Sequence, residues 1–222
     1  MPQGSERQLS LQLTTEEREV MIAEGRAATG RSCDGFSMCC KLPPFEIDGE
    51  WKPENVWCKY CRPGGAGCLI YDRRPEYCRG YSCLWLVHPD VRDHWKPSQS
   101  KMVMTVQEQW PGIWAFVVNV DPSAPNVWRD PRFYPDLKSL ARHALAGRAY
   151  VGVKAPCVVV VRKQQWVILP DKDVEVTSRS FHFARSRSGE WDIVFAKGEG
   201  DSHGSATGPR TAALNPRERG AH

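Results

Sequence analysis

The sequence predicts an α+β protein, in which a Cys-rich, metal-bound N-terminal module precedes a mainly antiparallel sheet with a covering helix. Eight of the nine cysteines lie between Cys33 and Cys83. Seven short segments rich in β-branched and aromatic residues follow residue 96, and turn residues separate them, as is typical of strands. Between the second and third of these segments, apolar residues recur at helical spacing. Strands and a helix in this arrangement indicate an α+β fold.

Residues 1–32 are expected to contain one helix. Thr14 and Glu17 have the spacing of a capping box, in which each side chain accepts a hydrogen bond from the backbone N–H of the other residue. Gly30 supplies a stop signal after the apolar residues that follow. We therefore expect a helix over about residues 15–28.

Residues 33–95 are expected to form a Cys-rich metal-binding module. Between Cys33 and Cys83 the chain is rich in Pro, Gly and polar residues, with no sustained period of 2 or 3.6. Such a segment has little apolar surface to pack against itself. Bound metal supplies the missing folding energy in small Cys-rich modules.

Residues 96–197 are expected to form the α+β domain, and residues 198–222 a disordered tail, since the tail has almost no large apolar side chains. The helix falls within residues 135–147 and ends at Gly147. The predicted strands are 102–107, 113–120, 157–162, 165–170, 173–178, 180–185 and 190–196.

Composition narrows the classes of partner and compartment. The chain of 222 residues is 41% apolar, as in ordinary globular proteins, and its net charge of +4 disfavours nucleic acid as a partner. Because no signal-peptide core and no stretch of about 18 apolar residues is visible, we expect a cytoplasmic protein without a membrane partner. A metal ion is the expected ligand, and a protein partner is left open.

The cysteine cluster supplies the candidate metal ligands. Cys58 and Cys61 form a C-x-x-C pair, whose spacing lets both sulfur atoms approach one ion. Eight thiols suit two tetrahedral four-thiolate sites, one such site with an iron-sulfur cluster, or one cluster with spare thiols. We therefore expect zinc ion(s) or an iron-sulfur cluster, bound by Cys33, Cys39, Cys40, Cys58, Cys61, Cys68, Cys78 and Cys83.

Cys39 and Cys40 are adjacent in the sequence. In an extended backbone their side chains point to opposite sides, which favours one ligand for each of two sites. In the alternative interpretation, one of the two is a small buried apolar residue.

Three other residues have weaker claims to the site. His88 and His94 follow the last clustered cysteine and could complete a mixed Cys/His site, but eight thiols already suffice. Cys157 begins the segment CVVVV, where we expect a buried, inert thiol in a strand.

The sequence from Cys68 to Arg79, CLIYDRRPEYCR, resembles the YkgJ-type cysteine-cluster family, whose members are described as zinc- or iron-chelating. That family has a C-x-x-C-x-x-C-C motif, then C-x-F-L, then C-x-I-Y-x-x-R-P-x-x-C-R. Phe36 stands where the second cysteine of the family is expected, and Cys61 replaces the apolar residue that ends C-x-F-L. The resemblance covers about 50 of the 222 residues, and the matching positions are Cys33, Cys39, Cys40, Cys58, Cys68, Tyr71, Arg74, Pro75, Cys78 and Arg79.

The resemblance implies a metal-binding protein with a structural or interaction role. It extends to the flagellin lysine N-methylases, which are similar but larger and carry an iron-sulfur cluster. The alternative function is therefore an iron-sulfur-dependent modification enzyme. No nucleophile or nucleotide-binding motif is recognisable in the sequence, so catalytic residues stay unassigned and an enzyme is the less favoured interpretation.

Overall fold

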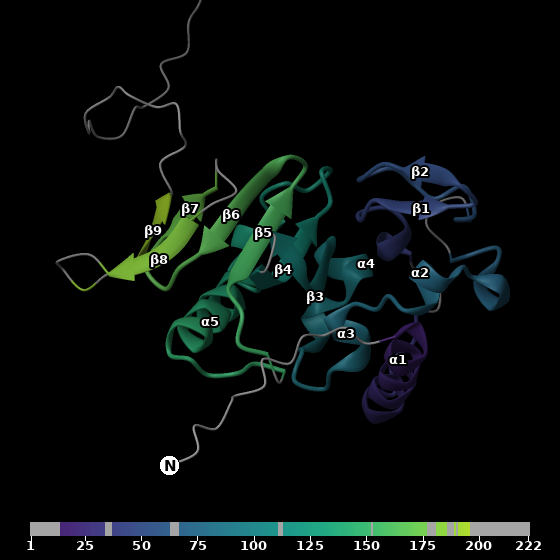
Figure 1. Cartoon of the computed structure of the whole chain (residues 1–222), viewed down its shortest axis with the longest axis horizontal. Coiled ribbons are helices and arrows are strands. Elements are labelled where there is room, and N and C mark those ends of the chain that lie inside the picture. The colour runs from purple at the N-terminus through teal and green to yellow at the C-terminus, as the bar shows by residue number, and fades with distance from the viewer. Residues whose placement is uncertain are drawn as a thin grey trace, which may run out of the picture.

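The protein has an α+β fold built around one five-stranded sheet, as Figure 1 shows for a computed structural model. The structure describes residues 14–33, 37–62, 67–110, 113–151, 153–176, 181–185, 189 and 191–195. The predicted α+β class with a mainly antiparallel sheet is confirmed. The predicted tail over residues 198–222 lies outside the described residues, as does Phe36.

The central sheet has the strand order β3-β4-β5-β6-β7. Neighbouring strands are antiparallel except for β4 and β5, which are parallel. A parallel pair needs a crossover connection, and α5 (Tyr134–Leu145) lies within it, where the sequence predicts the helix. The strands are β3 (Met102–Trp110), β4 (Ile113–Val120), β5 (Cys157–Val161), β6 (Gln164–Ile168) and β7 (Asp173–Glu175).

Both faces of the sheet are buried, and each face packs against a separate apolar core. Successive side chains along a strand point to opposite faces, so neighbouring residues belong to different cores. Val118 and Val120 of β4 belong to the larger core, which includes Leu137 of α5. Val117, which directly precedes Val118, belongs to the second core together with Ala115. The hairpin of β8 (Phe181–Arg185) and β9 (Trp191–Phe195) contributes Ile193 to that second core. One helix and one hairpin thus cover the two faces.

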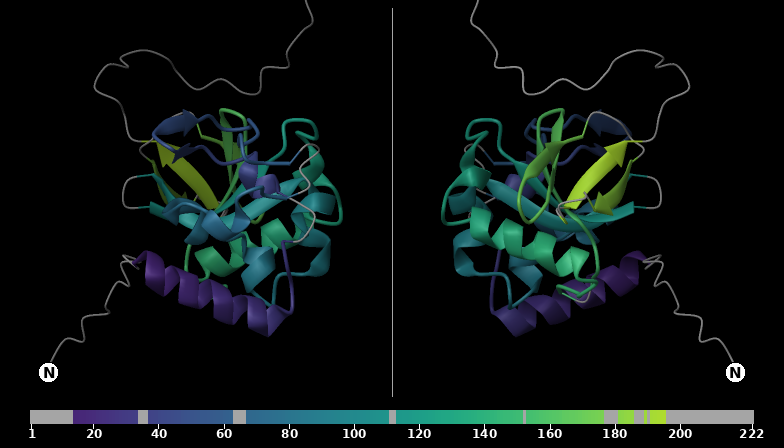
Figure 2. Two further views of the ribbon diagram at one scale, coloured as in Figure 1. Left: turned by 90° about the vertical axis from the view of Figure 1, so that its right-hand side faces the viewer. Right: turned by 90° about the vertical axis from the view of Figure 1, so that its left-hand side faces the viewer.

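Helix α1 (Thr15–Thr29) begins at the predicted capping box and ends at Gly30, whose φ is +64°. It lies on the outside of the molecule beside α3 (Leu84–Val87), as Figures 1 and 2 show. The Thr29 hydroxyl donates to the Leu86 carbonyl at 2.8 Å. The helix is therefore anchored to the segment that follows Cys83.

The Cys-rich segment contains short elements that are not among those predicted above. Asp48 and Gly49 join a hairpin of two three-residue strands, and both have positive φ, as a type I′ turn requires. The elements are η1 (Met38–Cys40), β1 (Phe45–Ile47), β2 (Glu50–Lys52), η3 (Tyr71–Arg73) and α2 (Glu76–Arg79). After α3 come η4 (Asp93–Trp95), α4 (Pro97–Ser100) and, beyond β4, η5 (Val127–Arg129).

The Cys-rich segment is held against the end of the sheet that carries β3 and β4. Met38 and Leu42 are buried in the same core as Met102 of β3. The Lys41 ammonium lies 2.8 Å from both carboxylate oxygens of Asp121, just after β4. In the ranges that the structure describes, no helix is long and apolar enough to cross a membrane.

The close approach of α1 to α3 gives a first prediction. A Cβ at Gly25 would lie 2.5 Å from the Val87 carbonyl oxygen, which is backbone and cannot move aside easily. Gly25→Ala gains about 0.5–1 kcal/mol in helix propensity, but overpacking costs about 1–3 kcal/mol. We expect net destabilisation in chemical denaturation. A variant as stable as the wild type or more stable would contradict the packing of α1 on α3.

The Lys41–Asp121 pair gives a second prediction. Burial raises the pKa of Asp121, but hydrogen bonds from Lys41 and from the Ser123 backbone outweigh it and hold the pKa below its usual range. Because the unfolded value is about 3.9, this stabilisation is present above about pH 4 and is lost as the pH falls below it. Asp121→Asn should lower the free energy of unfolding at pH 7 by roughly 1 kcal/mol and weaken its dependence on acid. Equal acid sensitivity in both proteins would argue against the pair.

Candidate metal centre

Seven of the eight clustered cysteines line one cavity of about 310 Å³. The eighth, Cys61, lies beside it, since its backbone pairs with that of the cavity residue Cys68. All nine cysteines are free thiols. The fold therefore brings together segments that lie up to fifty residues apart in the sequence. The cavity cysteines are Cys33, Cys39, Cys40, Cys58, Cys68, Cys78 and Cys83.

Cys157 is separate from this group, as the sequence predicts. It lies in β5 with no exposed surface. Burial raises the pKa of its thiol to about 12, so the group is neutral and inert.

The C-x-x-C pair forms a tight turn of the kind that presents thiols to an ion. The Cys61 backbone N–H donates to the Cys58 carbonyl at 2.9 Å, and the Tyr60 N–H donates to the Cys58 sulfur at 3.4 Å. Cys61 and Cys68 then pair as an antiparallel bridge. An N–H directed at sulfur favours the thiolate, which is the form that binds metal. The turn and the bridge thus place the backbones of these three cysteines side by side.

The arrangement of Cys39 and Cys40 corrects the expectation of opposite orientations. Both residues lie in the 3-10 helix η1 rather than in extended backbone. The neighbouring Cys39 thiol, and after it burial, raises the pKa of Cys40. Successive side chains of a 3-10 helix are about 120° apart rather than opposite, and both cysteines line the same cavity.

The cysteines occupy two apolar environments, which meet at η1. Cys58 is buried with Phe45 and Ile47 of the hairpin, and Cys40, Cys61 and Cys78 pack against them. Cys33 and Cys83 belong instead to the large core beside the sheet. A ligand in the cavity would therefore join the hairpin to the rest of the protein.

Several of the clustered thiols are held in their neutral form. Burial is the main cause that raises the pKa of Cys61 and Cys78 to about 11 and that of Cys83 to about 12. Among the residues that the structure describes, no group of three or more His, Cys, Asp or Glu side chains is arranged to hold an ion. Metal binding must therefore draw the sulfur atoms together and release protons.

Lys52 places a positive charge beside the thiols. Its residue is 6% exposed, and its ammonium donates to the carbonyls of Lys41 at 3.0 Å and Pro53 at 2.7 Å. Burial lowers the pKa of Lys52 to about 8, opposed by the nearby Cys58 and Cys40 and then by Glu54. Within the described part of the chain, Lys52 has no carboxylate within 4.0 Å. The positive charge of such a buried ammonium is better neutralised when the neighbouring thiols are ionised.

Tyr81 lines the same cavity and has an unsatisfied polar atom. Its hydroxyl oxygen is buried and, among the described residues, has no hydrogen-bond partner. Burial raises the pKa of Tyr81 well above its ordinary value, and negative charge on Cys39 and Cys83 acts to raise it further. A buried hydroxyl without a partner costs about 1–3 kcal/mol. A thiolate in the cavity would supply the missing acceptor.

Two arginines of the C-x-I-Y-x-x-R-P-x-x-C-R segment also surround the cavity. Arg79 pairs with Glu19 of α1 at 3.2 Å. Arg74 lies with its guanidinium carbon 3.8 Å from the centre of the Tyr71 ring. Its charge acts to lower the pKa of both Cys68 and Cys78, although burial outweighs this effect.

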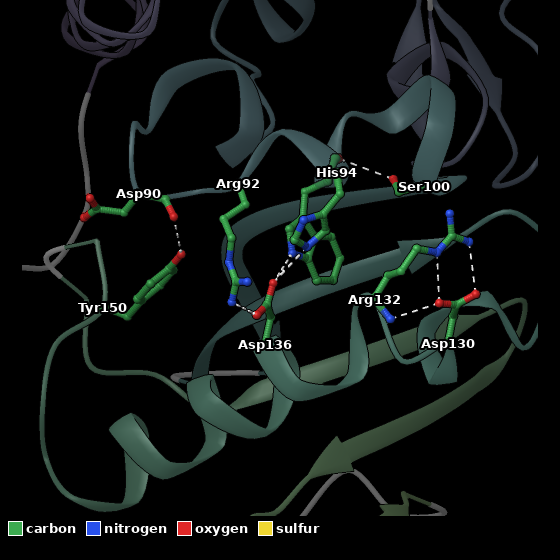
Figure 3. A network of polar contacts seen from close by, with 9 residues as sticks. Asp90, Arg92, His94, Ser100, Asp130, Arg132, Asp136 and Tyr150 are labelled. Carbon is green, nitrogen blue, oxygen red and sulfur yellow. Dashed lines mark hydrogen bonds and ion pairs between the residues drawn. The ribbon is translucent and has the colours of Figure 1, made fainter.

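His88 and His94 do not join the cysteines. Figure 3 shows that His94 and Arg92 converge on Asp136 of α5, and the His94 Nε2 atom lies 3.0 Å from that carboxylate. His88 lies beside Asp90 and Tyr150. Neither histidine lines the cysteine cavity, so a mixed Cys/His site is not formed here.

Lys52 and Tyr81 could not be identified from the sequence. Tyr81 lies two residues before Cys83, but no spacing rule says that its hydroxyl is buried. Lys52 becomes significant only because the hairpin folds back on Cys58. The one available signal is the Asp48-Gly49 dipeptide between alternating apolar residues, which predicts that hairpin.

Comparisons with protein-family models, with curated proteins and with solved structures found no match to this chain.

Proposed function

We propose that this is a metal-binding cysteine-cluster protein, whose clustered thiols hold zinc ion(s) or an iron-sulfur cluster in a structural or interaction role. The convergence of seven thiols on one cavity carries the proposal. Ordinary cores contain isolated thiols, like Cys157, and have no use for so many together. Free thiols of this number around one cavity are the donor set that zinc and iron-sulfur centres use.

Three features of the surroundings support the proposal. The Tyr60 N–H is directed at the Cys58 sulfur, the Tyr81 hydroxyl is without an acceptor among the described residues, and the Lys52 ammonium is buried nearby. Each of these groups favours negative charge on sulfur. Protonated thiols supply none, whereas metal-bound thiolates do.

A structural role follows from where the thiols come from. They lie on η1, on the turn at Cys58 and Cys61, on α2 and beside α3. These elements are three or four residues long and have only a small apolar cluster of their own. Thiolate coordination would supply the cross-links between them, as in small domains that fold only with metal.

A second candidate function, an iron-sulfur-dependent modification enzyme, rests on the size of the cavity. A structural four-thiolate site is filled by its own ligands and keeps no open position. Here the cavity of about 310 Å³ also has walls of apolar and aromatic side chains. Brown, oxygen-sensitive protein would favour this function, and colourless protein with stoichiometric zinc would favour the structural role.

Replacing single cysteines tests the proposal. The protein should be purified without oxygen, and its zinc and iron content measured together with its visible spectrum. We expect Cys68→Ser and Cys78→Ser to lower the metal content and to destabilise the fold, because each removes a ligand. Cys157→Ser is the matched control, since that thiol is also buried but far from the cavity in the fold, and we expect it to keep its metal.

Unchanged metal content in both variants would falsify the assignment of Cys68 and Cys78. Wild-type protein that contains no zinc or iron, and whose stability is unaffected by a chelator, would overturn the proposed function itself.

Tyr81→Phe should be harmless to metal-free protein but harmful to metal binding. In metal-free protein the variant loses only an unsatisfied hydroxyl, so its free energy of unfolding should be unchanged or higher. In loaded protein it loses a hydrogen bond to a thiolate, and loss of such an outer partner typically lowers metal affinity about 10- to 100-fold. Competition with a chelator measures the affinity. Equal metal affinity of the variant and the wild type would argue that the Tyr81 hydroxyl does not face a ligand.

A further inference from the structure

The lining of the cysteine cavity also includes Tyr71 and two arginines that contact it. Arg26 comes from α1, and its Nη1 atom donates to the Tyr71 hydroxyl at 3.3 Å. Arg74 stacks on the ring of the same tyrosine, and its Nε atom donates to the Tyr71 carbonyl at 2.8 Å. Both arginines and Tyr71 line the cavity. Two guanidinium groups from separate elements are thus fixed on one phenol; we call them the arginine pair.

The arginine pair lacks negative partners. Within the described ranges, neither Arg26 nor Arg74 has a carboxylate within 4.0 Å, whereas the neighbouring Arg79 pairs with Glu19 and Arg31 with Asp93. Like charges held close together repel each other. Both arginines are half-buried, while their hydrogen bonds to Tyr71 are exposed to solvent. An anion between the two guanidinium groups would relieve this repulsion.

Thiolate charge accounts for only one member of the pair. Arg74 lies near Cys68 and Cys78, so it balances charge on those sulfur atoms. Lys52 does the same for Cys40 and Cys58. Arg26 reaches the cavity from α1 and binds the hydroxyl end of Tyr71. Its charge is directed at the space beside the thiols.

The apolar residues that line the cavity indicate what kind of anion fits. Ile22 of α1, Ile70 and Leu86 line the cavity together with the arginine pair. Apolar walls with a few converging polar groups are typical of small-molecule sites, and about 310 Å³ is at the small end of their size range. A guanidinium matches the two oxygens of a carboxylate, forming two parallel hydrogen bonds. A compact carbon skeleton could occupy the apolar part.

We propose that the cavity binds a small organic acid, with its carboxylate held by Arg26 and Arg74 and its apolar or aromatic skeleton against Ile22, Ile70 and Leu86. The ligand then lies beside the thiols, and in this respect the inference deepens the proposed function and rests on it. Binding of the carboxylate itself depends only on the arginine pair and the apolar wall.

The test compares benzoate with benzamide, which has the same shape but no charge, by calorimetry on the full chain as purified. We expect benzoate to bind at least about tenfold more tightly, because charge-assisted hydrogen bonds contribute more than neutral ones. Inorganic phosphate, an anion without a carbon skeleton, should bind more weakly than benzoate. Equal binding of benzoate and benzamide, tighter binding of phosphate, or no binding of benzoate would each overturn the proposal.

Variants locate the site and separate it from the metal centre. Arg26→Gln should weaken benzoate binding about tenfold while leaving the metal content unchanged. Arg18→Gln, an exposed arginine on the same helix, is the matched control and should bind benzoate normally. Benzoate affinity unchanged by Arg26→Gln would refute the carboxylate site. Absence of metal from the wild type would refute the proposed function instead, and the comparison of benzoate with benzamide would still decide this inference.

Discussion

The Cys-rich segment depends on one physical constraint. Placing many thiols in one partly buried space costs free energy. Ionised together, the thiolates would repel one another, and burial opposes each charge. In their neutral form they leave the Tyr81 hydroxyl and the Lys52 ammonium poorly satisfied, as the structure describes them. A bound cation would resolve both difficulties, because it would stabilise thiolates beside these two groups.

The sheet and the Cys-rich segment are stabilised by different means. The sheet is buried on both faces by apolar side chains, and α1 is anchored to α3 by packing and hydrogen bonds. The segment from η1 to α2 has short elements, a small apolar cluster, an ion pair to Asp121 and, among its described residues, only two side chains, Met38 and Leu42, buried in the larger core. It is therefore the part of the molecule with most to gain from coordination, and it is where the cavity lies.

Much of the architecture could be predicted from the sequence because local patterns determine it. The capping box at Thr14, the alternating strands after residue 101 and the spacing of Leu137 and Leu140 all occur as expected. The β1–β2 hairpin was missed because three-residue strands are too short for a period to be visible. Cys39 and Cys40 were misplaced because the prediction assumed extended backbone, and tertiary packing set a 3-10 turn instead.

The candidate site, like the fold, could be predicted from the sequence only in part. Cysteine spacing identifies the thiols, since eight lie in one stretch of chain. The partners of those thiols could not be identified, because the environments of Lys52 and Tyr81 arise only when distant segments fold together. The pairing of Arg26 with Tyr71 joins residues 45 positions apart and has no local signal.

The most direct test of the central claim is X-ray absorption at the edge of whichever metal is found in protein purified without oxygen. Coordination by the clustered cysteines predicts a first shell of sulfur atoms, at about 2.3 Å for zinc. A first shell of nitrogen and oxygen atoms would show that the metal is bound elsewhere and would contradict the account.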